Sequence, residues 1–145
     1  MGKDFGLDNA INASRDDVVA EVRRRTEGRG ADASILAVGS NGLIRTAMEA
    51  VRPGGRVLLF AQTQHGEAVF DPAMVCVDEK TLIGSYSASV DLQQESVDLV
   101  MSGEMVLERL ISHHFPLTRA VEALQLAANP QPDSMKIVIQ PGSKK

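Results

Sequence analysis

Cysteine is nearly missing from this sequence, because Cys76 is the one cysteine among 145 residues. A single cysteine excludes a disulfide within the chain and a metal site built from a cysteine cluster. Free cysteines in soluble proteins are mostly buried, where they act as small apolar side chains. We therefore expect Cys76 to lie in the core.

Aromatic residues and positive charge are also scarce. The chain has four phenylalanines, one tyrosine and no tryptophan, so it lacks the aromatic platforms on which nucleic-acid bases stack. Its formal net charge is −4, which argues against nucleic acid and against an anionic membrane surface as partners. The one internal basic cluster is Arg23–Arg25, and the acidic residues around it favour a solvated helix face over a phosphate site.

Long apolar runs are absent as well. No stretch approaches the roughly 20 apolar residues that span a bilayer, and the polar N-terminal segment shows no signal-peptide pattern. We expect a protein without a membrane partner, located in the cytoplasm. With 43% hydrophobic and 23% charged residues, the composition is that of a soluble globular protein, and 145 residues suffice for a single domain with its own core.

The most regular part of the sequence runs from Gly30 to Ala61. An apolar stretch at Ser34–Val38 predicts a strand covered on both faces. The next apolar residues have helical spacing and stand at Ile44, Ala47, Met48 and Val51. Pro53–Gly55 is expected to end that helix, and Val57–Phe60 predicts a second strand. Strand, helix and strand with short links form the crossover unit of a parallel sheet.

Further elements are expected on both sides of this crossover. Ser14 with Asp17 three residues later fits a capping box, so a helix should run from there to about Thr26, with Glu21 and Arg25 paired one turn apart. The remaining pattern predicts a strand stub at Asn9–Asn12, a small strand at Val69–Phe70, a helical turn from Pro72 to Val77, a strand at Thr81–Ser87, a helix capped by Asp91, an extended piece at Leu110–Ser112, a helix from Leu117 that buries Ala120, Ala123, Leu124 and Ala127, and a strand at Lys136–Ile139. Alternating strands and helices indicate an α/β fold.

Two glycine-rich stretches invite a nucleotide-binding interpretation. Gly28, Gly30 and Ala33 match the dinucleotide-binding pattern G-x-G-x-x-A. However, they follow a predicted helix and precede a predicted strand, whereas phosphate binding needs the opposite order. Gly39–Gly42 stands between a strand and a helix. No acidic residue follows the next strand to hold a ribose hydroxyl, so this stretch suits a secondary wall of a nucleotide site.

The histidines do not form a metal-binding pattern. His113 and His114 are adjacent, so in a strand they point to opposite faces, and His65 stands alone. The sequence has no H-E-x-x-H motif, no cysteine pair and no G-x-S-x-G elbow. We predict no catalytic residue and no metal site in this chain.

Several stretches, taken in order, resemble the C-terminal part of the medium-chain, zinc-containing alcohol dehydrogenases, especially the sorbitol- and threonine-dehydrogenase-like branch. The resemblance covers nearly the whole chain. Its matching stretches are Phe5–Asn12, Thr26–Asp32, Ala37–Gly39, Arg52–Val57, Leu82–Ser85, Leu110–Leu117 and Lys136–Ile139.

The resemblance implies a fold, a reaction and a set of cofactor-facing residues. The fold is a partial Rossmann-like parallel sheet, the second half of a doubly wound domain. Residues 1–145 form a single truncated domain, and about 107–145 resemble the return of the chain to the catalytic domain. The family transfers hydride between an alcohol and NAD or NADP, with a zinc ion polarising the alcohol oxygen. The implied cofactor contacts are Val38, Gly39 and Ser40 on the adenosine side, Phe60, Ala61, Ser85, Tyr86 and Ser87 near the nicotinamide, and Lys136 at the pyrophosphate.

The sequence also departs from the family pattern. It lacks the catalytic domain with its zinc ligands, the structural-zinc cysteines, and the first strands with the glycine-rich fingerprint and the acidic ribose ligand. We therefore expect weak or no binding of NAD or NADP, and no dehydrogenase activity from this chain alone. An unpaired edge at Ser34–Val38 predicts a homodimer through exposed strand edges, or a shift of Asn9–Asn12 into the free place. The alternatives are a non-catalytic oligomerising or nucleotide-binding module and, from the Pro-Gly-Gly turn, a methyltransferase-like fragment.

Overall fold

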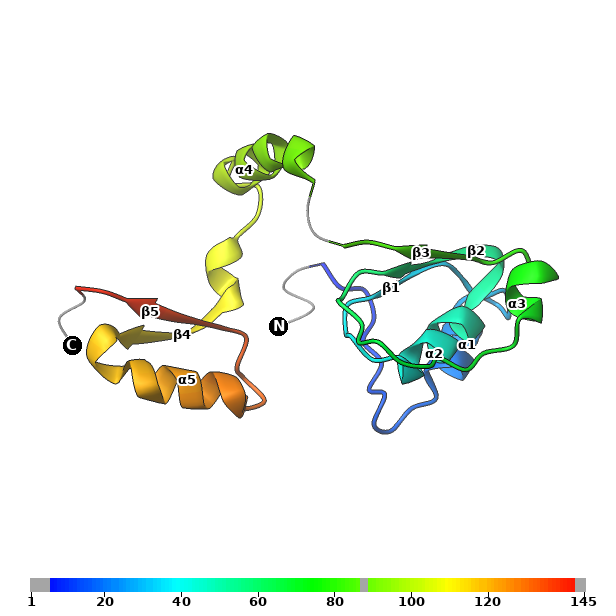
Figure 1. Cartoon of the computed structure of the whole chain (residues 1–145), viewed down its shortest axis with the longest axis horizontal. Helices are drawn as coiled ribbons and strands as arrows, with labels where there is room; N and C mark the ends of the chain where they lie inside the picture. Colours follow the sequence, from blue (N-terminus) through cyan, green and yellow to red (C-terminus); the bar gives the residue numbers. More distant parts are fainter. Residues whose placement is uncertain (1–5, 87–88, 143–145) are drawn as a thin grey trace. The chain divides into compact units, whose positions relative to one another are not determined.

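A computed structural model describes residues 6–86 and 89–142 and shows two compact units, Met1–Ser87 and Ala88–Lys145 (Figure 1). Each unit combines parallel strands with helices, as the α/β prediction requires. The assignment of the stretch from about residue 107 to the family's return into the catalytic domain stays a prediction.

The first unit contains a three-stranded parallel sheet in the order β1–β2–β3. Its strands are β1 (Ala31–Leu36), β2 (Val51–Leu59) and β3 (Thr81–Gly84), and its helices are α1 (Val18–Arg25), α2 (Gly42–Ala50) and α3 (Ala73–Cys76). Helix α2 joins β1 to β2, which confirms the central crossover. The helix ends at Ala50, before the Pro-Gly-Gly turn, and Pro53–Gly55 lie inside β2. The register between β1 and β2 shifts at this point, which accommodates the turn residues.

The core of this unit lies between α2 and the sheet. Met48 of α2 and Val57 of β2 are fully buried, and Ile44, Ala47 and Val51 join them. The predicted helix stripe is confirmed for Ile44, Ala47 and Met48, whereas Val51 is the first residue of β2 and not part of the helix. Lys80 is also buried, and its ammonium group donates a hydrogen bond of 2.9 Å to the carbonyl oxygen of Met48. This contact satisfies one of the last carbonyls of α2.

Within the described part of the first unit, no helix covers the opposite face of the sheet, so the expectation that Ser34–Val38 is covered on both faces is wrong for this unit. Ile35 pairs in register with Leu58, and Leu58 with Ile83, which forms an apolar row across the sheet. Ile35 is 65% exposed and Ile83 41% exposed. Helices α1 and α2 both lie on the other side of the strands (Figure 1).

Several local expectations in the first unit are corrected. Asp17, and not Ser14, caps α1, because its carboxylate accepts a hydrogen bond of 3.0 Å from the Ala20 amide. Ser14 belongs to a preceding turn, in which its amide donates to the side chain of Asn12. The stretches Asn9–Asn12 and Val69–Phe70 are not strands, so the first does not fill the free place beside β1. Cys76 is exposed at the end of the four-residue helix α3, so the expectation that it lies in the core is wrong.

In the second unit, two parallel strands pair with each other, β4 (Ile111–Pro116) and β5 (Lys136–Gln140), and helix α5 (Ala120–Ala128) connects them. Ala123 is buried, but Leu124 is 65% exposed and Ala127 is exposed as well. The buried side of α5 therefore passes through Ala123, and the predicted burial of Leu124 and Ala127 is wrong. The short 3-10 helices of this unit are η2 (Val90–Leu92), η3 (Leu107–Leu110) and η4 (Leu117–Arg119).

Helix α4 (Gln93–Met101) follows η2, which Ser89 caps by accepting a hydrogen bond from the Asp91 amide. The prediction that Asp91 is the capping residue is therefore wrong, because Ser89 caps this segment. The predicted apolar side of the helix is present, but its residues Val97, Val100 and Met101 are exposed. Among the described residues, no helix has the length and apolar character needed to cross a membrane.

Candidate functional site

The carboxyl ends of the three parallel strands in the first unit meet at one edge of the sheet. Open α/β sheets bind their ligands at this edge, in the loops that follow the strands. Here those loops are residues 37–41 after β1, 60–72 after β2 and, in the described part, 85–86 after β3. The sequence places most of its candidate cofactor residues in these three loops.

Backbone hydrogen bonds hold the starts of these loops together. The amides of Phe60 and Ala61 donate to the carbonyl oxygen of Leu36, at 3.1 and 2.9 Å. The amide of Ser85 donates to the carbonyl oxygen of Leu59, at 3.1 Å. The three strand ends therefore form one continuous wall, although they are distant in the sequence.

A close backbone approach fixes the loop after β2 against the loop after β1. A Cβ atom placed on Gly39 would lie 2.1 Å from the carbonyl oxygen of Gln62, so a side chain does not fit at this position. Asn41, at the start of α2, donates two hydrogen bonds of 3.4 Å from its side-chain amide, to the carbonyl oxygens of Gln64 and Glu67. Gly39 and Asn41 together hold residues 62–67 beside the strand ends.

A cleft of about 510 Å³ opens between the ends of β2 and β3. Its lining residues are Leu59, Ala61, Gln62, Thr63, His65, Gly84, Ser85 and Tyr86. A Cβ atom on Gly84 would meet nothing within 4 Å, so the end of β3 faces open space. The lining combines aliphatic groups with hydroxyl, amide and imidazole groups, a mixture of apolar and polar side chains that is typical of small-molecule sites.

Three of the predicted nicotinamide-side residues, Ala61, Ser85 and Tyr86, line this one cleft. Tyr86 is 82% exposed there. Sequence reasoning did not nominate Gln62, Thr63 or His65. These three residues could have been predicted from their position directly after a buried strand. The family resemblance had already placed the start of this loop near the cofactor.

The other nominated residues have different settings. Val38 and Phe60 are each 62% exposed and lie with Gly39 and Ser40 in the adjoining loops, outside the cleft lining. Ser87 lies outside the described residues. Lys136 is the exposed first residue of β5, in the second compact unit. The individual cofactor contacts of all these residues stay predictions.

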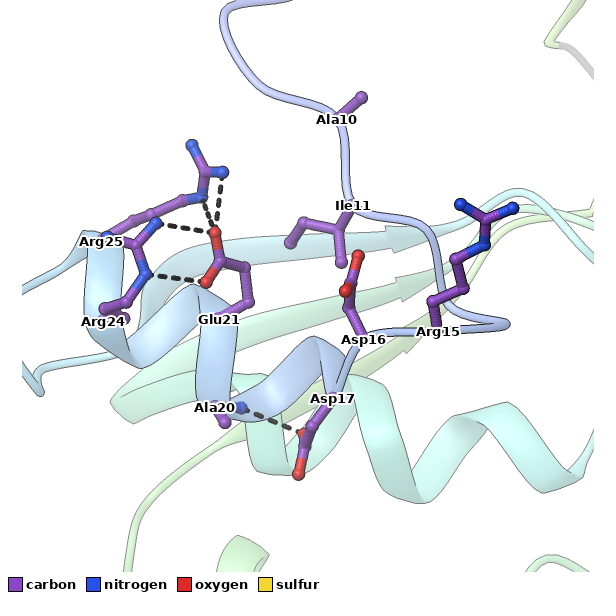
Figure 2. Close-up of a pocket in the computed structure, with 9 residues that line it drawn as sticks. All are labelled: Ala10, Ile11, Arg15, Asp16, Asp17, Ala20, Glu21, Arg24 and Arg25. Carbon is purple, nitrogen blue, oxygen red and sulfur yellow. Dashed lines mark hydrogen bonds and ion pairs between the residues drawn. The ribbon is translucent and has the colours of Figure 1, made fainter.

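A second cavity, of about 470 Å³, lies beside α1 and is lined mainly by charged side chains (Figure 2). Figure 2 shows the carboxylate of Glu21 between Arg24 and Arg25, which reach it at 2.7 Å. The hydrogen bond from Arg24 is the largest cause that lowers the pKa of Glu21, to about 2. The predicted pairing of Glu21 with Arg25 is confirmed. Both arginines are engaged with a carboxylate, as expected for an ion-paired helix face.

The described residues do not fit a zinc ion. Within residues 6–86 and 89–142, no three His, Cys, Asp or Glu side chains gather closely enough to hold a metal. His113 and His114 are successive residues of β4, and the Nδ1 atom of His113 lies 2.9 Å from the hydroxyl of Ser112.

The sequence is similar to known dehydrogenases over nearly its whole length. Residues 1–102 match the model of the protein family described as zinc-binding dehydrogenase. An alcohol dehydrogenase of Cupriavidus necator is 27% identical over 143 residues, which cover 97% of this chain and 39% of that protein. The NADP-dependent isopropanol dehydrogenase of Thermoanaerobacter brockii is also 27% identical, over 96% of this chain and 40% of its own length.

The fold is similar to solved dehydrogenases. The alcohol dehydrogenase TADH from Thermus sp. ATN1 has a TM-score of 0.80 and 28% identity, over 90% of this chain and 37% of that chain. The chain therefore spans about two fifths of the length of the relatives that it matches. It resembles their cofactor-binding half, with the Rossmann-type arrangement that the sequence predicts.

Proposed function

The chain belongs to the zinc-binding dehydrogenase family, and we propose that it forms the nicotinamide-facing half of the cofactor domain of an alcohol or polyol oxidoreductase that uses NAD or NADP. The observation that supports this function is the cleft at the carboxyl edge of the sheet. Ala61, Ser85 and Tyr86, which the resemblance assigns to the nicotinamide side, all line it. The established ligand position of open α/β sheets lies at the same edge.

Each loop at this edge has a distinct task in the proposed complex. The loop with Val38, Gly39 and Ser40 borders the adenosine side, and Phe60 and Ala61 lead into the nicotinamide cleft. Ser85 lines the cleft, and a hydroxyl group at this position suits a carboxamide, which needs hydrogen-bond partners. Ser87 and Lys136 are assigned to the nicotinamide and the pyrophosphate by the resemblance alone.

Binding by this chain alone is proposed to be weak. Strong dinucleotide sites receive the pyrophosphate on a glycine-rich turn that follows a strand and opens a helix. The glycines Gly28 and Gly30 instead follow α1 and lead into β1, so they do not offer that turn. The nicotinamide end therefore contributes most of the contacts.

Hydride transfer is not proposed for this chain by itself. In the family that the chain resembles, a zinc ion polarises the alcohol oxygen when it is bound. The described residues, 6–86 and 89–142, supply no cluster of three metal ligands. The groups that activate the alcohol would therefore have to come from outside these residues. Alcohol-dependent reduction of NAD or NADP by the purified chain, with bound stoichiometric zinc, would overturn this point.

A second proposal concerns assembly. In the described sheet, β1 and β3 are the outer strands and each has one edge without a neighbouring strand. Such edges pair readily with other chains, and we propose a homodimer formed through one of them. This proposal also fits a non-catalytic oligomerising module. Sedimentation equilibrium at micromolar concentration tests it, and a monomer that persists at the highest concentration would contradict it.

Calorimetric titration of the chain with NAD, NADP and S-adenosylmethionine separates the functional candidates. The proposed function predicts heat of binding with NAD or NADP that is reduced in Ser85→Trp, a variant that places a bulky side chain at a residue lining the cleft. The exposed position Ser102 in α4's C-cap provides a matched control, Ser102→Trp, which should bind as the unchanged chain does. Binding of S-adenosylmethionine alone would favour the methyltransferase-like alternative.

A further inference from the structure

His65 stands apart among the residues of the nicotinamide cleft, because it is the one lining residue whose side chain takes a positive charge. The lining described for this cleft contains no carboxylate and no other basic group. Histidine changes charge in the pH range between about 5 and 8. A cleft that is otherwise neutral thus acquires a cation when the imidazole is protonated.

The loop that carries His65 is held in place from both ends. Gly39 lies against Gln62 so closely that no Cβ fits between them, and Asn41 donates to the carbonyl oxygens of Gln64 and Glu67, on both sides of His65. Residues 62–67 are therefore fixed to the start of α2. This attachment keeps His65 at the cleft.

We propose that His65 makes the cleft selective for the redox state of the nicotinamide, because its protonated imidazole disfavours the cationic ring of the oxidised cofactor and leaves the neutral reduced ring unaffected. The inference rests on the proposed function, since it assumes that the nicotinamide enters this cleft. The oxidised ring carries one positive charge that the reduced ring lacks. Two like charges at a partly solvated site repel weakly, so the selectivity should change by roughly threefold to fivefold.

Two other titratable groups belong to this neighbourhood. Tyr86 lines the same cleft after β3, and Glu67 lies in the His65 loop. Both stay unchanged in the variants below, so their contributions cancel when the variants are compared at one pH.

The test is a titration of the full chain with NAD and with the acid-stable tetrahydro analogue of NADH, followed by NMR amide shifts. Affinities are measured at a mildly acidic and a mildly basic pH for the unchanged chain, for His65→Gln, which is neutral at both, and for His65→Lys, which is cationic at both. His113→Gln, a histidine in the second compact unit, is the matched control.

The proposal predicts that acidification lowers the affinity ratio of NAD to the reduced analogue by about threefold to fivefold in the unchanged chain and in His113→Gln. In both His65 variants, the affinity ratio of NAD to the reduced analogue should be independent of pH. It should be high in His65→Gln and low in His65→Lys. A ratio that falls equally in His65→Gln overturns the role of His65 and leaves the proposed function standing. Absence of binding by either dinucleotide overturns the proposed function together with this inference.

Discussion

The contact between Gly39 and Gln62 gives the sharpest test of how the cleft is built. In Gly39→Ala, the new Cβ would lie 2.1 Å from the carbonyl oxygen of Gln62. Real Cβ contacts of this kind are found at 3.0 Å or more, so the loop has to move by about 1 Å, and overpacking of this size costs about 1–3 kcal/mol. The same movement stretches the two hydrogen bonds from Asn41, which are already 3.4 Å long.

The expected loss of unfolding free energy for Gly39→Ala is therefore about 2–6 kcal/mol, since each of the two hydrogen bonds, if lost, adds roughly 0.5–1.5 kcal/mol. Gly84→Ala is the matched control, because its Cβ meets nothing within 4 Å. A glycine replaced without strain gains about 0.4–1 kcal/mol by restricting the unfolded chain. Urea unfolding followed by far-ultraviolet circular dichroism measures both variants.

A second readout locates the change within the molecule. The amide resonances of residues 62–67 should shift in Gly39→Ala, while those of the buried part of α2 stay in place. The reasoning is refuted if Gly39→Ala unfolds within about 0.5 kcal/mol of the unchanged chain, the usual range of surface substitutions, and keeps the amide shifts of this loop.

Three further predictions concern stability. Asp17→Ala should destabilise the first unit by about 1 kcal/mol, as loss of an N-cap does, whereas Ser14→Ala should leave urea unfolding unchanged; the reverse result would restore Ser14 as the cap. Met48→Ala should cost about 2–5 kcal/mol, because Met48 is fully buried, and Met101→Ala, at a residue that is 79% exposed, should cost far less; equal losses would contradict the core described for α2. The pKa of Glu21 is lowered from 4.5 to about 2, so its ion pairs stabilise the fold above pH 4.5 and this contribution disappears as the pH falls towards 2. Acid unfolding of Glu21→Gln should lack that part of the pH dependence, and identical acid profiles would disprove the link.

The central crossover was predictable because its signal is local. Ile44, Ala47 and Met48 form one face of α2 and are buried as their spacing indicates. Val51, the last residue of the predicted stripe, is also buried, but it is the first residue of β2. The strand-forming run that follows needs no distant partner to be recognised. Such patterns depend on the period of the backbone and survive without knowledge of the rest of the fold.

The predictions that the structure contradicts share one cause. They depend on contacts between segments, which a single stretch of sequence does not reveal. Ile35 belongs to an apolar run, but whether a helix covers its side of the sheet depends on other elements, and it is 65% exposed. Ser14 and Asp17 are both residue types that cap helices, and the turn at Asn12 decides between them. Leu124 and Ala123 are neighbours, and the position of β4 and β5 selects the smaller residue for burial.

The same distinction applies to the cleft. Ala61, Ser85 and Tyr86 were nominated because collinear stretches of the sequence resemble a family whose cofactor lies at this edge. His65 was not, because its place at the cleft depends on Gly39 and Asn41, which are distant in the sequence. Gly39 lies against the carbonyl group of Gln62, and the side-chain amide of Asn41 donates to loop carbonyl oxygens. Long-range loop contacts of this kind leave no periodic signal.

Intermolecular nuclear Overhauser effects between NAD and the full chain test the central claim most directly. The account predicts contacts from the nicotinamide ring protons to the methyl group of Ala61 and the ring of Tyr86, and their disappearance in Ser85→Trp. Nicotinamide contacts to the charged cavity beside α1, or to no residue of the first unit, would contradict the assignment of this cleft.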